Sequence, residues 1–383
     1  MTTATAPTQT SIRFQVNNAE LNPALRRLSG IVDHAQVIQI LGFVKCVLSN
    51  DSMLMIASNS EIEMHVRVAI SHDMPSLDEQ EIEFTLPCKK LLDISRTLPN
   101  NASIAVEQNQ NWTSIRVGKT AFKLASLGVE GFPQLDPFTP EAKFAITEAE
   151  FLWLLRRSAF AMAHQDVRFF LNGLLLKLAK QHIETAATDG HRLAKNVLSY
   201  AESLPERQCI LPKKTVQELC KHLQESDSLV HISLGKQHIS FISESLELYS
   251  NLIEGDYPDY EKLLPREFAH RAVIDVALLK SSLQRMITLA NEKYHGASLN
   301  FSDSKLTLSA NNINHEEAND ELNIVYTGEP VKVGLNIHYV QELLQVVETE
   351  TIEIGIVNTE KSITFTELDS SNQSQFIVMP LTL

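Results

Sequence analysis

The chain of 383 residues contains three copies of the same pattern of segments. LPCKKLLDI, LPKKTVQEL and LNIHYVQELL begin about 125 residues apart, at Leu86, Leu211 and Leu335. LRRLSG, LRRSAF and LQRMIT recur at nearly the same interval, with leucines at helical spacing in both sets. A period of this length predicts that the chain folds as three similar modules.

Each repeat combines two amphipathic helical segments with several runs of alternating apolar residues. Thr147 and Glu150 form a T-x-x-E capping box at the start of one helix, and Asn336 is a suitable N-cap for another. The strand-like runs begin after Gly42, Gly173 and Gly296. The predicted helices cover residues 19–30, 88–98, 147–163, 212–224, 275–290 and 337–347. This pattern predicts an α+β fold with two helices packed on β-sheets in each domain.

The ends of the repeats mark the domain boundaries. EGFPQL and EGDYPDY place Pro133 and Pro258 at matching positions. We therefore predict a polar tail over residues 1–11 and three domains over 12–138, 139–265 and 266–383. Three such domains can stack as beads or curve into an arc that dimerisation closes, and the period does not distinguish the two.

The composition is that of a globular protein, with 44% hydrophobic and 21% charged residues. The first residues carry neither a basic start nor an apolar run, so we do not expect a signal peptide, and there is no apolar stretch long enough for a membrane helix. The four cysteines lack CxxC or metal-binding spacing. We expect reduced thiols, a cytoplasmic location and no metal.

Basic residues are concentrated in the predicted helices of an otherwise acidic chain. The formal net charge is −14, which by itself argues against nucleic acid, yet lysine or arginine occurs in five of the six helical segments. Solvated helix faces are the simpler explanation for any single pair. A repeated basic surface instead predicts contact with DNA phosphates without base reading. The residues concerned are Arg26, Arg27, Lys89, Lys90, Arg96, Arg156, Arg157, Lys213, Lys214, Lys221, Lys280 and Arg285.

The segment TDGHRLA, residues 188–194, raises the question of catalysis. Asp189 and His191 are suited to acid–base chemistry, and His191 to metal binding. However, GxSxG, HExxH, a Walker loop and GxGxxG are all missing from the sequence, as is any further ligand at suitable spacing. We therefore interpret TDGHRLA as non-catalytic, although an enzyme using Asp189 and His191 remains the alternative.

Two non-catalytic interpretations stay open for the same segment. In the first, Asp189 and Gly190 form a turn while the neighbouring side chains pack against the next domain. In the second, Leu171, Leu193 and Leu263 join Pro258 in an apolar groove at a domain junction, where peptides bind.

Four motifs resemble the bacterial sliding clamp family, the beta subunits of DNA polymerase III. They are MAHQDVRFFLNG (162–173), ATDGHRLA (187–194), YPDYEKLLP (257–265) and VMPLTL (378–383), and the resemblance runs from about Ile12 to Leu383. It implies three similar domains per chain and a head-to-tail homodimer that forms a ring around duplex DNA. The family acts as a non-catalytic processivity factor without a cofactor.

The same resemblance implies the partners. They are the DNA polymerase III alpha subunit, the clamp loader, and repair polymerases and mismatch-repair proteins, which bind through glutamine-led linear segments with apolar ends. The implied peptide pocket comprises Leu171, Thr188, Gly190, His191, Arg192, Leu193, Pro258, Lys262, Leu263, Ser362, Ile377, Val378, Met379, Pro380 and Leu381. Gln165, Arg168, Phe169 and Phe170 match a loop that contacts DNA, and Phe122, Leu124, Thr288 and Leu289 match the dimer interface.

The chain departs from the family pattern in four places. Phe169 and Phe170 replace paired tyrosines, Lys262 replaces a common arginine, MPLTL lacks a penultimate arginine, and HAQVIQILG lacks an arginine expected to contact DNA. These differences keep a clamp-like paralogue that serves repair as an alternative to the replicative clamp.

Overall fold

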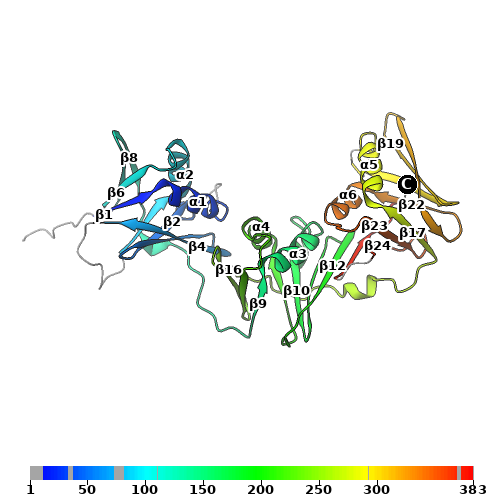
Figure 1. The fold of residues 1–383 in the computed structure, drawn as a ribbon, viewed down its shortest axis with the longest axis horizontal. Helices are drawn as coiled ribbons and strands as arrows, with labels where there is room; N and C mark the ends of the chain where they lie inside the picture. The colour runs from blue at the N-terminus through cyan, green and yellow to red at the C-terminus, as the bar shows by residue number, and fades with distance from the viewer. Residues whose placement is uncertain are drawn as a thin grey trace, which may run out of the picture. The chain divides into compact units, whose positions relative to one another are not determined.

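A computed structural model describes residues 12–32, 38–72, 82–109, 111–291, 293–368 and 372–382 (Figure 1). The predicted polar tail and part of HAQVIQILG lie outside these residues. The chain divides into two compact units. The first contains residues up to 145 with 221–223 and 228–251, and the second contains 146–220, 224–227 and 252 onward.

Six α-helices are present among the described residues, and each begins within one residue of its predicted start. The capping box of Thr147 and Glu150 forms as expected, and the side chain of Asn336 accepts hydrogen bonds at the start of the last helix. Pro87 is the N-cap of the helix that begins at Cys88. The helices are α1 (Asn18–Leu28), α2 (Cys88–Thr97), α3 (Glu148–Ala159), α4 (Lys213–His222), α5 (Val276–Ile287) and α6 (Ile337–Gln345).

The first unit is built on an antiparallel sheet with the strand order β8-β7-β6-β1-β4-β16-β15-β14-β9, to which β2, β3 and β5 are attached. Helices α1 and α2 pack on each other, and α1 also packs on β4. The strands are β1 (Ile12–Asn17), β2 (Phe43–Leu48), β3 (Ser52–Ser58), β4 (Ile62–Ser71), β5 (Ile82–Pro87), β6 (Ser103–Asn109), β7 (Trp112–Val117), β8 (Thr120–Ala125), β9 (Ala142–Thr147), β14 (Leu229–Leu234), β15 (His238–Ile242) and β16 (Glu247–Asn251).

The second unit contains two sheets, with orders β13-β10-β11-β12-β25-β24-β23-β17-β21 and β20-β19-β18-β22. Helix α3 packs on β11 and β12, and α5 packs on α6. The strands are β10 (Gly173–Ala179), β11 (His182–Thr188), β12 (Arg192–Ser199), β13 (Arg207–Pro212), β17 (His270–Asp275), β18 (Gly296–Ser302), β19 (Lys305–Asn311), β20 (Glu317–Asn323), β21 (Val325–Thr327), β22 (Val331–Asn336), β23 (Thr351–Ile356), β24 (Ile363–Glu367) and β25 (Gln373–Val378).

The packing of α-helices on antiparallel sheets confirms the predicted α+β class. Strands distant in sequence join where repeats meet, since β4 pairs with β16 in the first unit and β12 pairs with β25 in the second. No helix in the described part of the chain has the length and apolarity needed to cross a membrane.

Candidate functional site

TDGHRLA forms the tight turn between β11 and β12. Asp189 Oδ1 accepts hydrogen bonds from the backbone amides of His191 (2.9 Å) and Arg192 (3.1 Å). Thr188 Oγ1 donates to the Arg192 carbonyl at 2.6 Å and accepts from the Gly190 amide at 3.1 Å. Gly190 has a φ of 89°, a left-handed conformation that favours glycine. The carboxylate of Asp189 therefore holds the turn and makes no hydrogen bond to the His191 ring.

Arg192 connects this turn to α6. Its Nε lies 3.0 Å from Asp189 Oδ2, its Nη1 forms an ion pair with Glu342, and its guanidinium stacks over Tyr339 at 4.4 Å. The side chain of Arg192 is mostly buried, so these contacts are only weakly screened by water. Arg192 thus fixes the turn instead of presenting a free cation.

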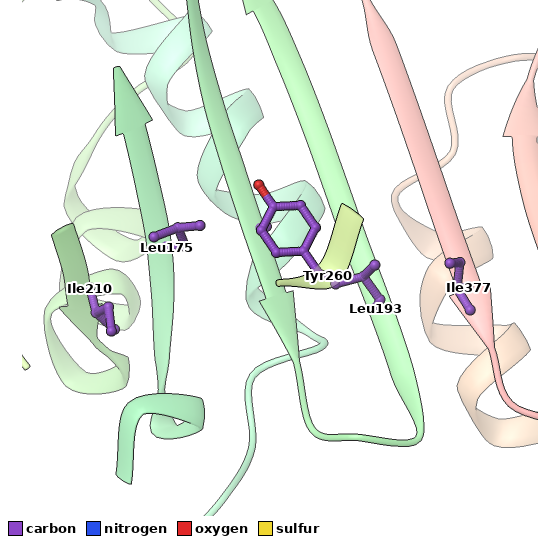
Figure 2. Close-up of a cluster of buried hydrophobic side chains, with 6 residues drawn as sticks. Leu175, Leu193, Ile210, Tyr260 and Ile377 are labelled. Atoms are coloured by element: carbon purple, nitrogen blue, oxygen red, sulfur yellow. The ribbon is translucent and has the colours of Figure 1, made fainter. Parts of the chain in front are cut away.

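An apolar cluster lies beneath the turn. Figure 2 shows side chains from β10, β12, β13 and β25 gathered around Tyr260. The buried members are Leu175, Ala186, Leu193, Ile210, Tyr260 and Ile377, and Phe170, Ile253, Tyr257 and Leu264 pack against them. Of the predicted pocket residues, Leu193 and Ile377 belong to this cluster, and Leu171 and Val378 are also buried.

Sequence reasoning missed the two tyrosines in this region. The Tyr257 hydroxyl accepts a hydrogen bond from the Thr188 amide at 2.9 Å, and the Tyr260 hydroxyl donates to the buried Glu184. Burial raises the pKa of Tyr257 well above its ordinary value, so this phenol stays neutral. Two aromatic residues spaced three apart in YPDYEKLLP were the available signal.

Four further predicted pocket residues, Lys262, Leu263, Ser362 and Met379, line a cavity of about 480 Å³ in the second unit. It is lined by residues 262–267, Val357, 360–362 and Met379. Leu263 is 52% exposed and Met379 is 37% exposed, an unusual amount for large apolar side chains. Pro258 lies in the same connecting segment and accepts a backbone hydrogen bond from Tyr260.

The C-terminal segment is held in place by two backbone hydrogen bonds. The amide of Met379 donates to the His191 carbonyl at 2.8 Å, and the amide of Leu381 donates to the Gly334 carbonyl at 2.8 Å. The first bond joins the end of the chain directly to the turn. Pro380 lies between the two anchored residues, so the position of residues 379–381 depends on both contacts.

The loop before β10 lies against the turn. A Cβ atom on Gly190 would come within 3.3 Å of Arg168 Nη2. Arg168 pairs with Asp166 at 2.9 Å, and its hydrogen bonds lower the pKa of that carboxyl to about 2. Phe169 is 62% exposed, whereas Phe170 packs on the apolar cluster. Gln165, at a φ of 54°, is exposed on the same loop.

The predicted basic helix residues differ in their surroundings. Arg26, Lys89, Lys90, Arg96, Arg156, Lys221 and Arg285 are exposed, and Arg27, Lys213, Lys214 and Lys280 are half-buried. Arg27 donates to the Ser245 carbonyl at 2.6 Å, and Lys213 donates to the Ala163 carbonyl at 3.1 Å. The side chains of Arg27 and Lys213 therefore already make hydrogen bonds within the chain.

The prediction that Arg157 faces DNA is wrong. Its side chain is 2% exposed and forms an ion pair with Glu367, while Nε donates to Ser374 Oγ at 3.1 Å. Consecutive helix residues point about 100° apart, so Arg156 faces solvent when Arg157 faces the sheet. Arg157 joins α3 to β24 and β25.

The predicted interface residues lie near two sheet edges. β8 ends the sheet of the first unit, and β20 ends the small sheet of the second. Leu124 is buried and Phe122 is half-buried, whereas Thr288 is exposed and Leu289 is half-buried after α5. Both edges therefore have unpaired backbone groups within the described structure.

Within the described residues, no group of three or more His, Cys, Asp or Glu side chains is arranged to hold a metal ion. The carboxylate of Asp189 already accepts hydrogen bonds from the backbone amides of the turn. The apolar side chains of this region are the buried cluster around Tyr260 and the exposed Leu263 and Met379 beside the cavity.

Comparisons with known proteins agree from residue 12 to residue 382. The family models of the DNA polymerase III beta subunit match with the N-terminal domain at residues 12–136, the central domain at 145–259 and the C-terminal domain at 261–382. The beta sliding clamp of Pseudomonas aeruginosa is 32% identical over 97% of this chain and 100% of its own length. That of Escherichia coli K12 is 31% identical over 97% of this chain and 100% of its own.

Solved structures give the same result. A sliding clamp from Pseudomonas aeruginosa bound to griselimycin matches with a TM-score of 0.91 and 31% identity, over 98% of this chain and 100% of that one. A clamp from Bartonella birtlesii bound to griselimycin matches with a TM-score of 0.90 and 25% identity, over 98% of this chain and 100% of that one.

Proposed function

Because the chain belongs to the DNA polymerase III beta subunit family of sliding clamps, we propose that two copies close head to tail into a ring around duplex DNA. The ring tethers the polymerase and has no catalytic activity of its own. It acts in the cytoplasm, where the bacterial chromosome is replicated. The match to all three family domains carries this proposal.

The proposed partner groove consists of the TDGHRLA turn, the apolar cluster beneath it, and the 480 Å³ cavity beside Leu263 and Met379. Exposed apolar side chains supply the driving force for binding a linear segment with apolar ends. The backbone of the turn supplies polar contacts at the rim. We propose that the alpha subunit of the polymerase, the clamp loader and repair proteins share this groove.

Ring closure is proposed to pair β8 of one copy with β20 of the other. Lys119 and Lys123 lie at β8, whereas Glu317, Asp320 and Glu321 lie on β20. Within the chain, Asp320 pairs with Arg285 and Glu321 pairs with Lys305. The opposite signs of Lys119 and Lys123 on one open edge and Glu317 on the other favour this pairing over the pairing of identical edges.

Leu289→Asp is expected to convert the dimer largely into monomers, because a charge buried in the interface would remain without a partner. Sedimentation velocity measures the change. Leu278→Asp, at a 52% exposed leucine of α5, is the matched control and should remain dimeric. A Leu289→Asp protein that sediments as the wild-type dimer would place the interface elsewhere.

Topological attachment to DNA predicts a specific salt response. A ring loaded on nicked circular DNA is expected to stay bound in salt that removes it from short linear DNA, because screening weakens phosphate contacts but does not open the ring. Gel filtration of the loaded complex, before and after linearising the circle, measures retention. Protein that remains on the linearised DNA would contradict encirclement.

A further inference from the structure

A second cavity, of about 390 Å³, lies in the first unit where β4 meets β16. Its lining includes four aromatic rings, those of His65, Phe138, His238 and Tyr249. Pro137 and Pro140 complete an apolar wall. All four rings are only partly buried, so the cavity is open to solvent.

The rings are arranged in two pairs. Phe138 stacks on His238 with centroids 5.7 Å apart and an interplanar angle of 23°, and His65 lies 5.0 Å from Tyr249 at 48°. Gly235 allows the first pair to form, because a Cβ at that position would lie 2.5 Å from Phe138 Cδ2. The aromatic walls are therefore fixed by packing before any ligand arrives.

The cavity also carries excess negative charge. Glu63 lies 2.6 Å from His65 Nε2, and Glu247 lies 3.1 Å from His65 Nδ1. Burial lowers the pKa of His65, but hydrogen bonds to Glu247 and Glu63 raise it overall to about 9. The imidazolium of His65 thus pairs with two carboxylates, of which Glu63 lines the cavity and Glu247 lies outside the lining. The exposed Asp136 is the second carboxylate of the lining. No lysine or arginine is among the residues that line the cavity.

Strand register relates this cavity to the proposed partner groove. In the second unit, Leu193 pairs with Ile377, and both contribute to the apolar cluster. In the first unit, the corresponding strand pair places Glu63 opposite Tyr249. Because a carboxylate and a phenol replace two aliphatic side chains, the two sites require ligands of different chemistry.

We propose that the aromatic cavity binds an organic cation, the alkylguanidinium or alkylammonium group of an arginine or lysine side chain or of a free amine. The faces of the Phe138 and Tyr249 rings attract such cations, whereas the imidazolium of His65 is paired with Glu63 and Glu247. The exposed Asp136 supplies the matching charge, since Glu63 is already held by His65 and the Leu135 amide, and the prolines contact the alkyl portion. This site is independent of the partner groove and of ring closure.

The test uses two probes with the full-length protein, propylguanidinium and the peptide acetyl-Gly-Arg-Gly-amide. Binding is expected to shift the methylene protons of the alkyl chain that carries the guanidinium group upfield in NMR titrations, because they enter the ring currents of Phe138 and Tyr249. If the peptide binds more tightly than propylguanidinium, the natural ligand is a protein segment. If the two probes bind with equal affinity, it is a free amine. The absence of an upfield shift for both probes at about 10 mM, tenfold above a Kd of about 1 mM, would overturn the proposal.

Two variants separate the ring and charge contributions. Phe138→Leu keeps an apolar side chain over Gly235 but removes the aromatic face, and is expected to weaken binding about threefold or more. Asp136→Asn is expected to weaken binding at low salt and to have less effect at high salt. Asp51→Asn, at an exposed aspartate outside the cavity lining, is the matched control. Equal affinity in all three variants would place the probe outside the cavity.

Discussion

Deleting residues 379–383 is expected to weaken binding of a QLxLF-type peptide by about 100-fold or more. The deletion removes the Met379 side chain and the bond from its amide to His191. The peptide would lose two apolar contacts, each worth about 1.5–3 kcal/mol, and a loss of this size corresponds to at least about a 100-fold fall in affinity. Fluorescence anisotropy with labelled peptide measures the affinity, and sedimentation should still report a dimer.

Leu193→Asp tests the floor of the same groove and is expected to abolish peptide binding. Because Leu193 is buried, circular dichroism must accompany this variant. His191→Gln is the matched control on the turn, since its backbone contacts remain, and a loss of only a few-fold is expected. Wild-type affinity in both the truncated protein and Leu193→Asp would remove TDGHRLA from the groove.

Arg157→Ala is expected to lower the free energy of unfolding of the second unit by about 3–5 kcal/mol. The variant leaves the carboxylate of Glu367 buried without its cation and removes the hydrogen bond to Ser374. Urea unfolding can be followed by the fluorescence of Trp153, which lies 4.8 Å from the Arg157 guanidinium. The reference protein and each variant in this experiment also carry Trp112→Phe, so that Trp153 is the only tryptophan that reports unfolding.

The neighbouring Arg156→Ala is the matched control. Arg156 and its partner Glu225 are both exposed, so this change is expected to cost less than about 1 kcal/mol. Arg157→Met combined with Glu367→Leu should recover part of the loss, because no unpaired charge remains. Equal stabilities of Arg156→Ala and Arg157→Ala would contradict the structural role of Arg157.

The sequence by itself determined the repeat and the helices. The period can be read directly from the sequence, and capping residues and leucine spacing are local properties. In the structure, hydrogen bonds of the Thr147 and Asn336 side chains cap helices at the predicted starts. The motifs around Asp189 also located the candidate site, because a turn of this kind needs glycine and a side-chain acceptor within a few residues.

Only the tertiary structure decided which side chains face the site. Arg156 and Arg157 are adjacent in sequence, yet one is exposed and the other is buried by strands more than 200 residues away. Tyr257 reaches the site through the distant Thr188 amide. Strand pairing likewise placed Glu63 opposite Tyr249 in the first unit and Leu193 opposite Ile377 in the second. Such pairings depend on contacts between distant segments, which spacing along the chain does not specify.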